Sequence, residues 1–129
     1  LIYSKAPVAE ISFGGYDRDE NASQYGFRIM PPDTNGDVGL THYVQYNNLG
    51  WKYWDKATQT ENGPFPGNIF WQGFGGVCES DNAGDPIVLY DEQVDRWLVS
   101  QFAVSSSPYS MCVAISTSPD PTGSFHQYL

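Results

Sequence analysis

Acidic and amide side chains are concentrated in one turn-like stretch in the first third of the chain. Asp33, Asn35 and Asp37 occupy alternate positions of PPDTNGDVG, residues 31–39. This spacing suits a hard cation, because Ca²⁺ takes about six to eight oxygen ligands. The stretch begins like an EF-hand loop but has Val38 where that loop requires glycine, so it is not an EF-hand. It is interpreted either as a calcium loop or as a metal-free turn whose side chains cap their own backbone.

A second acidic stretch contains Asp81 and Asp85. If the two stretches are equivalent, Asp37 and Asp85 begin neighbouring strands, and their carboxylates repel unless a cation or ligand offsets them. Asp81 and Asp85 are therefore expected as further calcium ligands. Alternatively, Asp37 and Asp85 are the acid and base of a glycoside hydrolase, which needs carboxyl groups about 5–10 Å apart. Two separate solvated loops are the simpler interpretation.

Four tryptophans and nine tyrosines supply many aromatic rings. An aromatic face complements the apolar face of a sugar ring. Trp51 and Trp54 fall on opposite faces of one expected strand, so one of them is a candidate for an exposed ligand contact. Trp71, with Phe65 and Phe70, flanks a Pro/Gly-rich loop and is a second candidate. The alternative is that these rings form an ordinary β-sheet core.

Two features favour an extracellular setting. Cys78 and Cys112 each border an expected strand, and the Tyr- and Asn-rich acidic composition suits a compartment where disulfides persist. A disulfide between them is expected, and two buried free thiols are the alternative. Asn21 begins the sequon Asn-Ala-Ser in an expected loop, which predicts N-glycosylation if the source is a eukaryotic secretory protein.

The charge balance excludes several classes of function. Fifteen acidic residues against six basic ones give a formal net charge of -9. Nucleic acid is not an expected partner, because phosphate neutralisation needs clustered Lys and Arg. The same charge disfavours anionic membranes, and no apolar run approaches the roughly 20 residues that cross a bilayer. Nucleophile-elbow and zinc-protease motifs are also absent from the sequence.

Strands are the elements expected to position these residues. Tyr, Trp, Phe, Val and Ile dominate the ordered-looking segments, which is typical of a half-buried pleated surface, so the expected fold class is all-β. Residues 87–90, 96–104, 111–117 and 125–129 predict four strands joined by tight turns. Such an antiparallel four-stranded meander matches one blade of a β-propeller. A β-sandwich stapled by one disulfide is the alternative.

The first half of the chain is less regular. A short strand is expected within residues 1–12, a hairpin from 41–46 and 51–55, and a short strand at 69–71. Residues 31–39 are expected to be a turn. The polar stretch between these segments carries no apolar stripe of helical spacing, so no helix is expected there.

An imperfect internal repeat relates the two halves. Phe-Gly-Gly triplets at 13–15 and 74–76 are each followed by an Asn-Ala pair at the same offset. Downstream, Gly-Asp pairs at 36–37 and 84–85 each precede an apolar strand, a turn and a tryptophan. The repeat supports two copies of one structural unit.

This repeat predicts a single all-β unit of about two blades, at approximately residues 11–73 and 74–129. A closed propeller typically needs about four to eight blades. The chain is therefore expected to be a fragment of a longer protein and to pack against the remainder of its own propeller.

The strings PPDTNGDVG-LTHYVQ, GDPIVLYDEQVDRWLVSQFA and CVAISTSPDPTGSF resemble blades of a propeller-like repeat in large secreted, mostly bacterial, multidomain proteins. The resemblance covers about residues 31–56 and 74–129 and implies an extracellular β-propeller module. The turn from Ser118 to Phe125 also looks like a degenerate Asp-box of sialidase-type propellers, with one extra residue before Gly123 and Phe125 in place of Trp. In those enzymes this turn is structural, so the resemblance implies no catalytic residue in it.

Three functional hypotheses follow. The first is a non-catalytic extracellular β-propeller segment, stabilised by calcium, for binding or adhesion to a glycan or another extracellular protein. The second is part of a propeller-fold glycoside hydrolase with Asp37 and Asp85 as catalytic carboxylates, supported by Asp33 or Asp81. The third is a structural subunit of an extracellular assembly, in which aromatic-rich sheet edges pair between chains.

Overall fold

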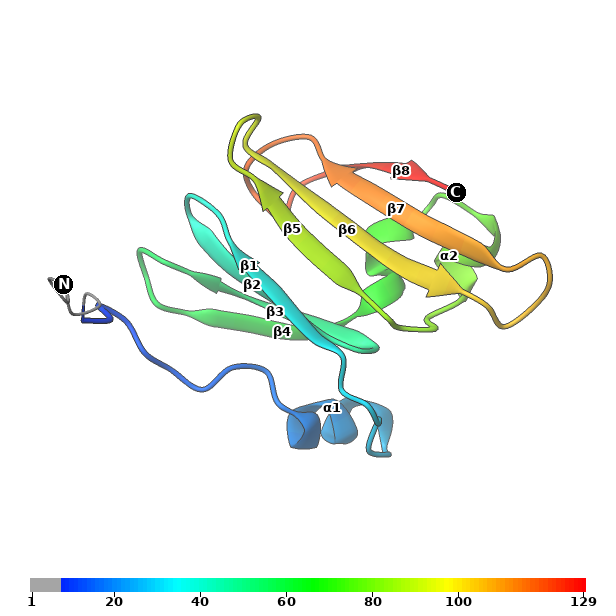
Figure 1. The fold of residues 1–129 in the computed structure, drawn as a ribbon, viewed down its shortest axis with the longest axis horizontal. Helices are drawn as coiled ribbons and strands as arrows, with labels where there is room; N and C mark the ends of the chain where they lie inside the picture. Colours follow the sequence, from blue (N-terminus) through cyan, green and yellow to red (C-terminus); the bar gives the residue numbers. More distant parts are fainter. Residues whose placement is uncertain (1–7) are drawn as a thin grey trace, which may run out of the picture.

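The computed structural model describes residues 8–129, which form two four-stranded antiparallel sheets and three short helical segments (Figure 1). Sheet A contains β1 (Thr34–Val38), β2 (His42–Asn47), β3 (Gly50–Asp55) and β4 (Glu61–Pro66). Sheet B contains β5 (Ile87–Asp91), β6 (Arg96–Ala103), β7 (Ser110–Ser116) and β8 (Phe125–Tyr128). The helical segments are α1 (Arg18–Tyr25), the 3₁₀ helix η1 (Gly67–Trp71) and α2 (Gly76–Ser80). Each sheet is a meander in chain order. The predicted β class and the meander in the last third are confirmed. No helix in residues 8–129 has the length and apolar character of a membrane span.

The first strands of the two sheets lie side by side (Figure 1). Asn35 Oδ1 accepts a hydrogen bond from the Val88 N–H at 2.6 Å, and Asp37 Oδ2 accepts one from the Tyr90 N–H at 2.8 Å. Residue numbers rise in the same direction along both strands, so β1 and β5 run parallel. The other edge of β5 pairs with β6. The two β1 side chains therefore satisfy N–H groups that an open strand edge would leave unpaired.

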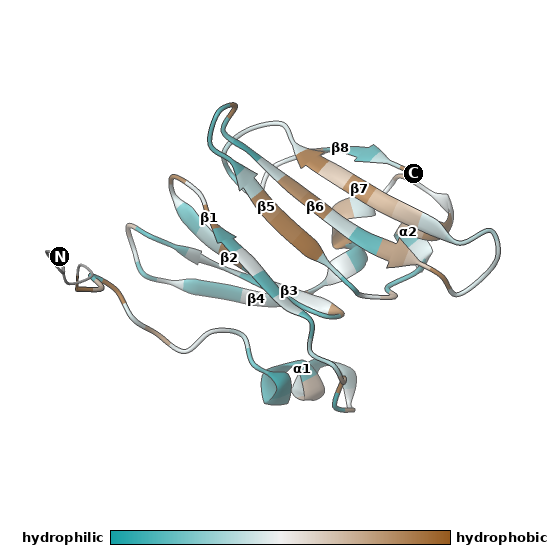
Figure 2. Cartoon of the chain, in the orientation of Figure 1, coloured by the Kyte–Doolittle hydropathy of each residue, from teal (hydrophilic) through white to brown (hydrophobic). Residues whose placement is uncertain are grey.

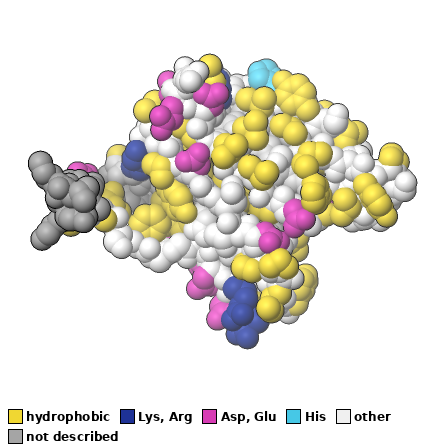
Figure 3. Space-filling view, in the orientation of Figure 1, with side chains coloured by type: hydrophobic (Ala, Val, Ile, Leu, Met, Phe, Trp, Pro, Cys, Tyr) yellow, Lys and Arg dark blue, Asp and Glu magenta, His cyan; other side chains and the backbone are white. Residues whose placement is uncertain are grey.

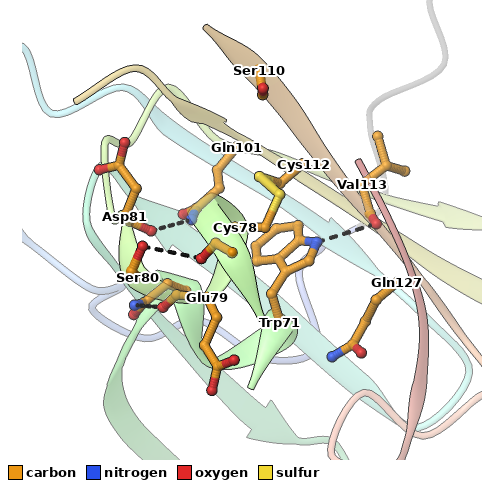
Figure 4. The surroundings of a disulfide bond; sticks show 12 residues. Trp71, Cys78, Glu79, Ser80, Asp81, Gln101, Ser110, Cys112, Val113 and Gln127 are labelled. Carbon is orange, nitrogen blue, oxygen red and sulfur yellow. Dashed lines mark hydrogen bonds between the residues drawn. A yellow bond between two sulfur atoms is a disulfide. The ribbon is translucent and has the colours of Figure 1, made fainter. Parts of the chain in front are cut away.

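The core lies between the sheets, where η1 and α2 also pack. Trp71 of η1 is fully buried beside the disulfide, and its indole N–H donates to the Val113 carbonyl at 3.2 Å (Figure 4). Cys78 of α2 and Cys112 of β7 are bonded and fully buried, with Cα atoms 5.7 Å apart. The expected disulfide is confirmed, and it fixes the α2 segment to the middle of sheet B.

The face of sheet A that points away from sheet B is polar where the N-terminal segment covers it, and aromatic around Tyr43 and Trp54, where a pocket of about 670 Å³ opens beside Phe13. Tyr16 donates its N–H to Gln45 Oε1 at 3.0 Å, and Gln45 Nε2 donates back to the Tyr16 carbonyl at 2.8 Å. Lys52, only 2% exposed, pairs with Glu20 of α1. Asn21 of α1 donates to the Asn47 carbonyl. These polar contacts cover the part of sheet A around Gln45, Asn47 and Lys52.

The opposite face of sheet B is apolar, and no other described segment covers it. Strand alternation puts Val88, Val99 and Ala114 in the core and leaves their neighbours outside. Figure 2 shows the apolar colouring of β5, β6 and β7, and Figure 3 shows hydrophobic side chains gathered over them. We call this surface the outer face of sheet B; its apolar part consists of Ile87, Leu89, Leu98, Phe102, Met111, Val113, Ile115 and Tyr128, and the same face carries Ser100 and, at its margins, Asp91, Arg96 and His126.

Two predictions about the first half are wrong. The segment 34–38, expected as part of a turn, is β1. Its only apolar residue is the exposed Val38, because the side chains of Asn35 and Asp37 bond to the edge of β5 rather than fill a core. The stretch expected to be non-helical contains α1, whose first turn is capped reciprocally: Asp17 accepts from the Asp19 and Glu20 N–H groups, and Glu20 accepts from the Asp17 N–H. Its buried face is polar, so no apolar stripe was visible.

The remaining differences concern short elements and the repeat. Residues 8–12 are not in a strand, and residues 1–7 lie outside the described part; residues 69–71 are helical. The first Phe-Gly-Gly triplet precedes α1 and the second runs into the start of α2, so each leads into a short helix that the repeat did not predict. The Gly-Asp pairs are not equivalent, because 36–37 lies inside β1 and 84–85 precedes β5.

Candidate ligand-binding site

A cleft of about 530 Å³ opens between the outer strands of the two sheets. The cleft lies on the side of the molecule away from β1 and β5. There, η1 is inserted between β3 and β4 of sheet A and β8 of sheet B. We call it the aromatic cleft; its lining residues are Trp51, Tyr53, Phe65, Ile69, Phe70, Gln72, Pro121, Thr122, Gly123, Ser124, Phe125 and Gln127.

Aromatic rings form one wall and the floor of the cleft. Trp51 and Phe65 are cross-strand partners with ring centroids 5.3 Å apart, and Tyr53 lies nearly parallel to Phe65, at 11° and 6.1 Å. Phe70 of η1 packs edge-on against Phe125 of β8 at 5.0 Å, which joins the two sheets. The rings on β3 and β4 therefore form a continuous apolar platform.

The opposite wall is the turn between β7 and β8. The Trp97 indole N–H donates to the Pro119 carbonyl at 2.9 Å, and Asp120 Oδ1 accepts from the Thr122 N–H at 2.8 Å and from its hydroxyl at 2.7 Å. Partial burial would raise the pKa of Asp120, but the bonds from Thr122 outweigh it and lower that pKa. The side chain of Asp120 is therefore ionised at neutral pH, and its hydrogen bonds to Thr122 stabilise the turn that forms this wall.

Gln127 is the polar group at the cleft with spare hydrogen-bonding capacity, and one buried donor nearby is unpaired. Gln127 Nε2 donates to the Phe70 carbonyl at 2.8 Å and to the Gln72 carbonyl at 3.4 Å. These bonds use its nitrogen and leave Oε1 as an acceptor. The Trp51 Nε1–H is buried and has no acceptor among residues 8–129. A buried donor without a partner costs about 1–3 kcal/mol, but this nitrogen is closed off from the open space of the cleft.

The five residues predicted to bind calcium are used in different ways. Asn35 and Asp37 bond to the edge of β5. Asp81 accepts from the Ser105 N–H at 2.8 Å and from its hydroxyl at 2.7 Å; burial opposes ionisation, but these bonds lower its pKa. Within residues 8–129, no three His, Cys, Asp or Glu side chains are placed to share a metal ion.

Asp33 and Asp85 do come together. They precede β1 and β5, and both have positive φ, 44° and 48°. The pKa of Asp33 is raised, mainly by burial and next by the charge and hydrogen bond of Asp85. A hydrogen bond from Asn48 acts in the opposite direction but does not cancel the rise. Asp37 lies four residues along β1 from Asp33, about 13 Å at the usual strand rise. The hydrolase hypothesis needs Asp37 and Asp85 about 5–10 Å apart, and the structure puts them at opposite ends of the paired strands.

The substitution Asp85→Asn is expected to raise Tm at pH 7 by about 1–3 °C, because it removes a negative charge beside the half-buried Asp33. Because the folded-state pKa of Asp33 is raised, its ionisation destabilises the fold above that pKa and the cost disappears as pH falls through it. The gain should therefore vanish in acid. Thermal melts at several pH values test this; an equal gain at every pH would contradict it. Calcium that raises the Tm of the wild type but not of Asp85→Asn would place a cation at this pair.

The other predicted site residues are buried. Trp51 and Trp54 lie on opposite faces of β3, as expected, but they are 5% and 6% exposed. Trp54 packs against Phe13 and Tyr43, with ring centroids 5.2 and 5.3 Å apart. Trp71 offers no free ring face because it is in the core. Asn21, the predicted glycosylation site, is 1% exposed and its Nδ2 is bonded to sheet A, so the sequon is not in an accessible loop here.

The sequence indicated part of the aromatic cleft. Phe65 and Phe70 were secondary candidates, and Tyr53 was identifiable as the residue two positions from Trp51 on the same strand face. Phe125 and Gln127 carried no signal, because their place depends on how sheet B stands against sheet A. Comparison of the chain with protein-family models, curated proteins and solved structures gave no match.

Proposed function

We propose that the chain is a non-catalytic extracellular binding module made of two consecutive β-propeller-type blades. The parallel placement of β1 beside β5 carries this proposal. Around a propeller axis, the first strands of neighbouring blades run in one direction and each blade is a consecutive meander. Immunoglobulin-type sandwiches instead exchange strands between sheets through Greek-key connections. Both sheets of this chain follow chain order.

The exposed apolar outer face of sheet B favours a third sheet packed on it. Polar contacts with Tyr16, Glu20 and Asn21 cover only part of the outer face of sheet A, and a pocket beside Trp54 stays open on the rest of it. Sheet B instead exposes Ile87, Leu89 and Met111 by 44%, 51% and 45%. The occupant we assign to this face is the next four-stranded blade of the same polypeptide, packed as sheet A packs on the inner side of sheet B.

The Cys78–Cys112 disulfide supports the extracellular part of the proposal. Disulfides persist in oxidising compartments and are rare in the reducing cytosol. Both cysteines are fully buried in the core rather than exposed for redox exchange, which favours a structural role.

The double substitution Leu89→Lys and Ile115→Lys tests the stacking surface. These side chains flank Leu98 on neighbouring strands, so two charges there should disrupt an apolar docking face while leaving the core intact. With its face uncovered, the isolated wild-type chain is expected to bind the dye 8-anilinonaphthalene-1-sulfonate and to associate weakly in sedimentation. The variant should reduce dye fluorescence at least about twofold with little change in Tm.

Val94→Lys is the matched control, since Val94 is 58% exposed at the β5–β6 turn, outside this face. It should behave as the wild type. A wild-type chain that binds no dye and stays monomeric would contradict the proposal. A tight stoichiometric dimer broken by the double substitution would also overturn it, because the occupant would then be a second copy.

A further inference from the structure

We propose that the aromatic cleft binds an uncharged oligosaccharide. This inference rests on the binding role proposed above and names the ligand class and the site. It is carried by the rings on β3 and β4 together with the free amide oxygen of Gln127.

The ring platform suits a pyranose. Tyr53 and Phe65 lie within 11° of parallel, and Trp51 is tilted from them by 31° and 41°. Tyr53 and Phe65 are only partly buried, so part of their surface faces the cleft. Apolar C–H groups of a sugar pack on such a surface, and each stacked ring is worth about 0.5–1.5 kcal/mol beyond area burial.

The polar groups around the platform match sugar hydroxyls. Gln127 offers Oε1 as an acceptor, and Thr122 and Ser124 stand on the opposite wall. A hydroxyl is both donor and acceptor, so it can satisfy these mixed groups together.

The absence of charge narrows the ligand class. None of the described residues that line the aromatic cleft is ionisable at neutral pH, and the chain has a net charge of -9. A phosphate or carboxylate ligand would lose its hydration without a cationic partner. A proline-rich peptide also docks on aromatic grooves, but it offers few donors for Gln127 Oε1. An uncharged glycan can pack its C–H groups on the aromatic rings and donate a hydroxyl to Gln127 Oε1.

Isothermal titration calorimetry with cellohexaose, mannohexaose and N-acetylchitohexaose tests the proposal. At least one should bind the wild type, and Tyr53→Ala should raise its Kd about 3–10-fold through the lost ring. Tyr53→Phe, which keeps the ring, should remain close to wild type. Gln127→Ala should weaken binding by a similar factor through the lost hydrogen bond.

Tyr109→Ala is the matched control, because Tyr109 is 74% exposed between β6 and β7, away from the cleft. It should bind as the wild type. Binding of none of the three glycans, an equal loss in Tyr109→Ala, or binding of decaproline in their place would overturn the inference. The lysine variant of the outer face of sheet B should retain glycan binding, so the failure of either proposal can be recognised separately.

Discussion

Replacing both Cys78 and Cys112 with serine is expected to lower the free energy of unfolding by about 4 kcal/mol and Tm by about 10–20 °C. The bridge closes a loop with a sequence separation of 34 that spans α2, β5 and β6. Its loss gives the unfolded chain more conformational freedom and puts two hydroxyls into a fully buried site. Urea unfolding of the two proteins measures the difference.

Reduction of the wild type under native conditions separates these two effects, because it removes the bond without adding hydroxyls. It should reproduce most of the loss. A change below about 1 kcal/mol in both experiments would show that the bridge does not stabilise this fold.

Asp37→Ala is expected to destabilise the protein by about 1–3 kcal/mol. The substitution removes the acceptor of the Tyr90 N–H and leaves that group at an uncovered edge of β5. Asp37→Asn keeps an acceptor oxygen and should lose less. Chemical unfolding provides the measurement.

Glu92→Ala is the control, because Glu92 lies exposed at the tip of the β5–β6 hairpin and its removal should be near neutral. If Asp37→Ala were as neutral as Glu92→Ala, the β1 side chains would not be holding the edge of β5. The contact between the two sheets would then depend on the core alone.

The last third of the chain could be predicted because its strands carry local signals. Val88 and Tyr90 alternate with the exposed Ile87 and Leu89, and short polar turns separate the strands. Both the strand positions and the meander follow from these features without reference to distant residues.

The first strand of sheet A could not be predicted in this way. Asn35, Gly36 and Asp37 have low strand propensity, and what stabilises them as a strand is the edge of β5, more than fifty residues later. Asn35 and Asp37 were predicted to be calcium ligands because the sequence shows only the spacing of their oxygen-bearing side chains and not their partners. Their partners proved to be backbone N–H groups.

The aromatic cleft shows the same limit. Trp51 and Tyr53 share one expected strand, but Phe65 lies on β4, a strand that the sequence did not predict. Phe125 and Gln127 reach the site only because sheet B stands against η1. For a site formed between two sheets, the sequence can therefore predict residues that are neighbours within one strand but not those that the second sheet contributes.

Amide hydrogen exchange at Val88 and Tyr90 tests the placement of β1 beside β5 most directly. Neither N–H belongs to the β5–β6 ladder, and each is bonded to a β1 side chain. Both amides should be protected in the wild type, and Asp37→Ala should release Tyr90 while Val88 stays protected. Free exchange of both amides in the wild type would contradict the paired strands and the blade-like arrangement built on them.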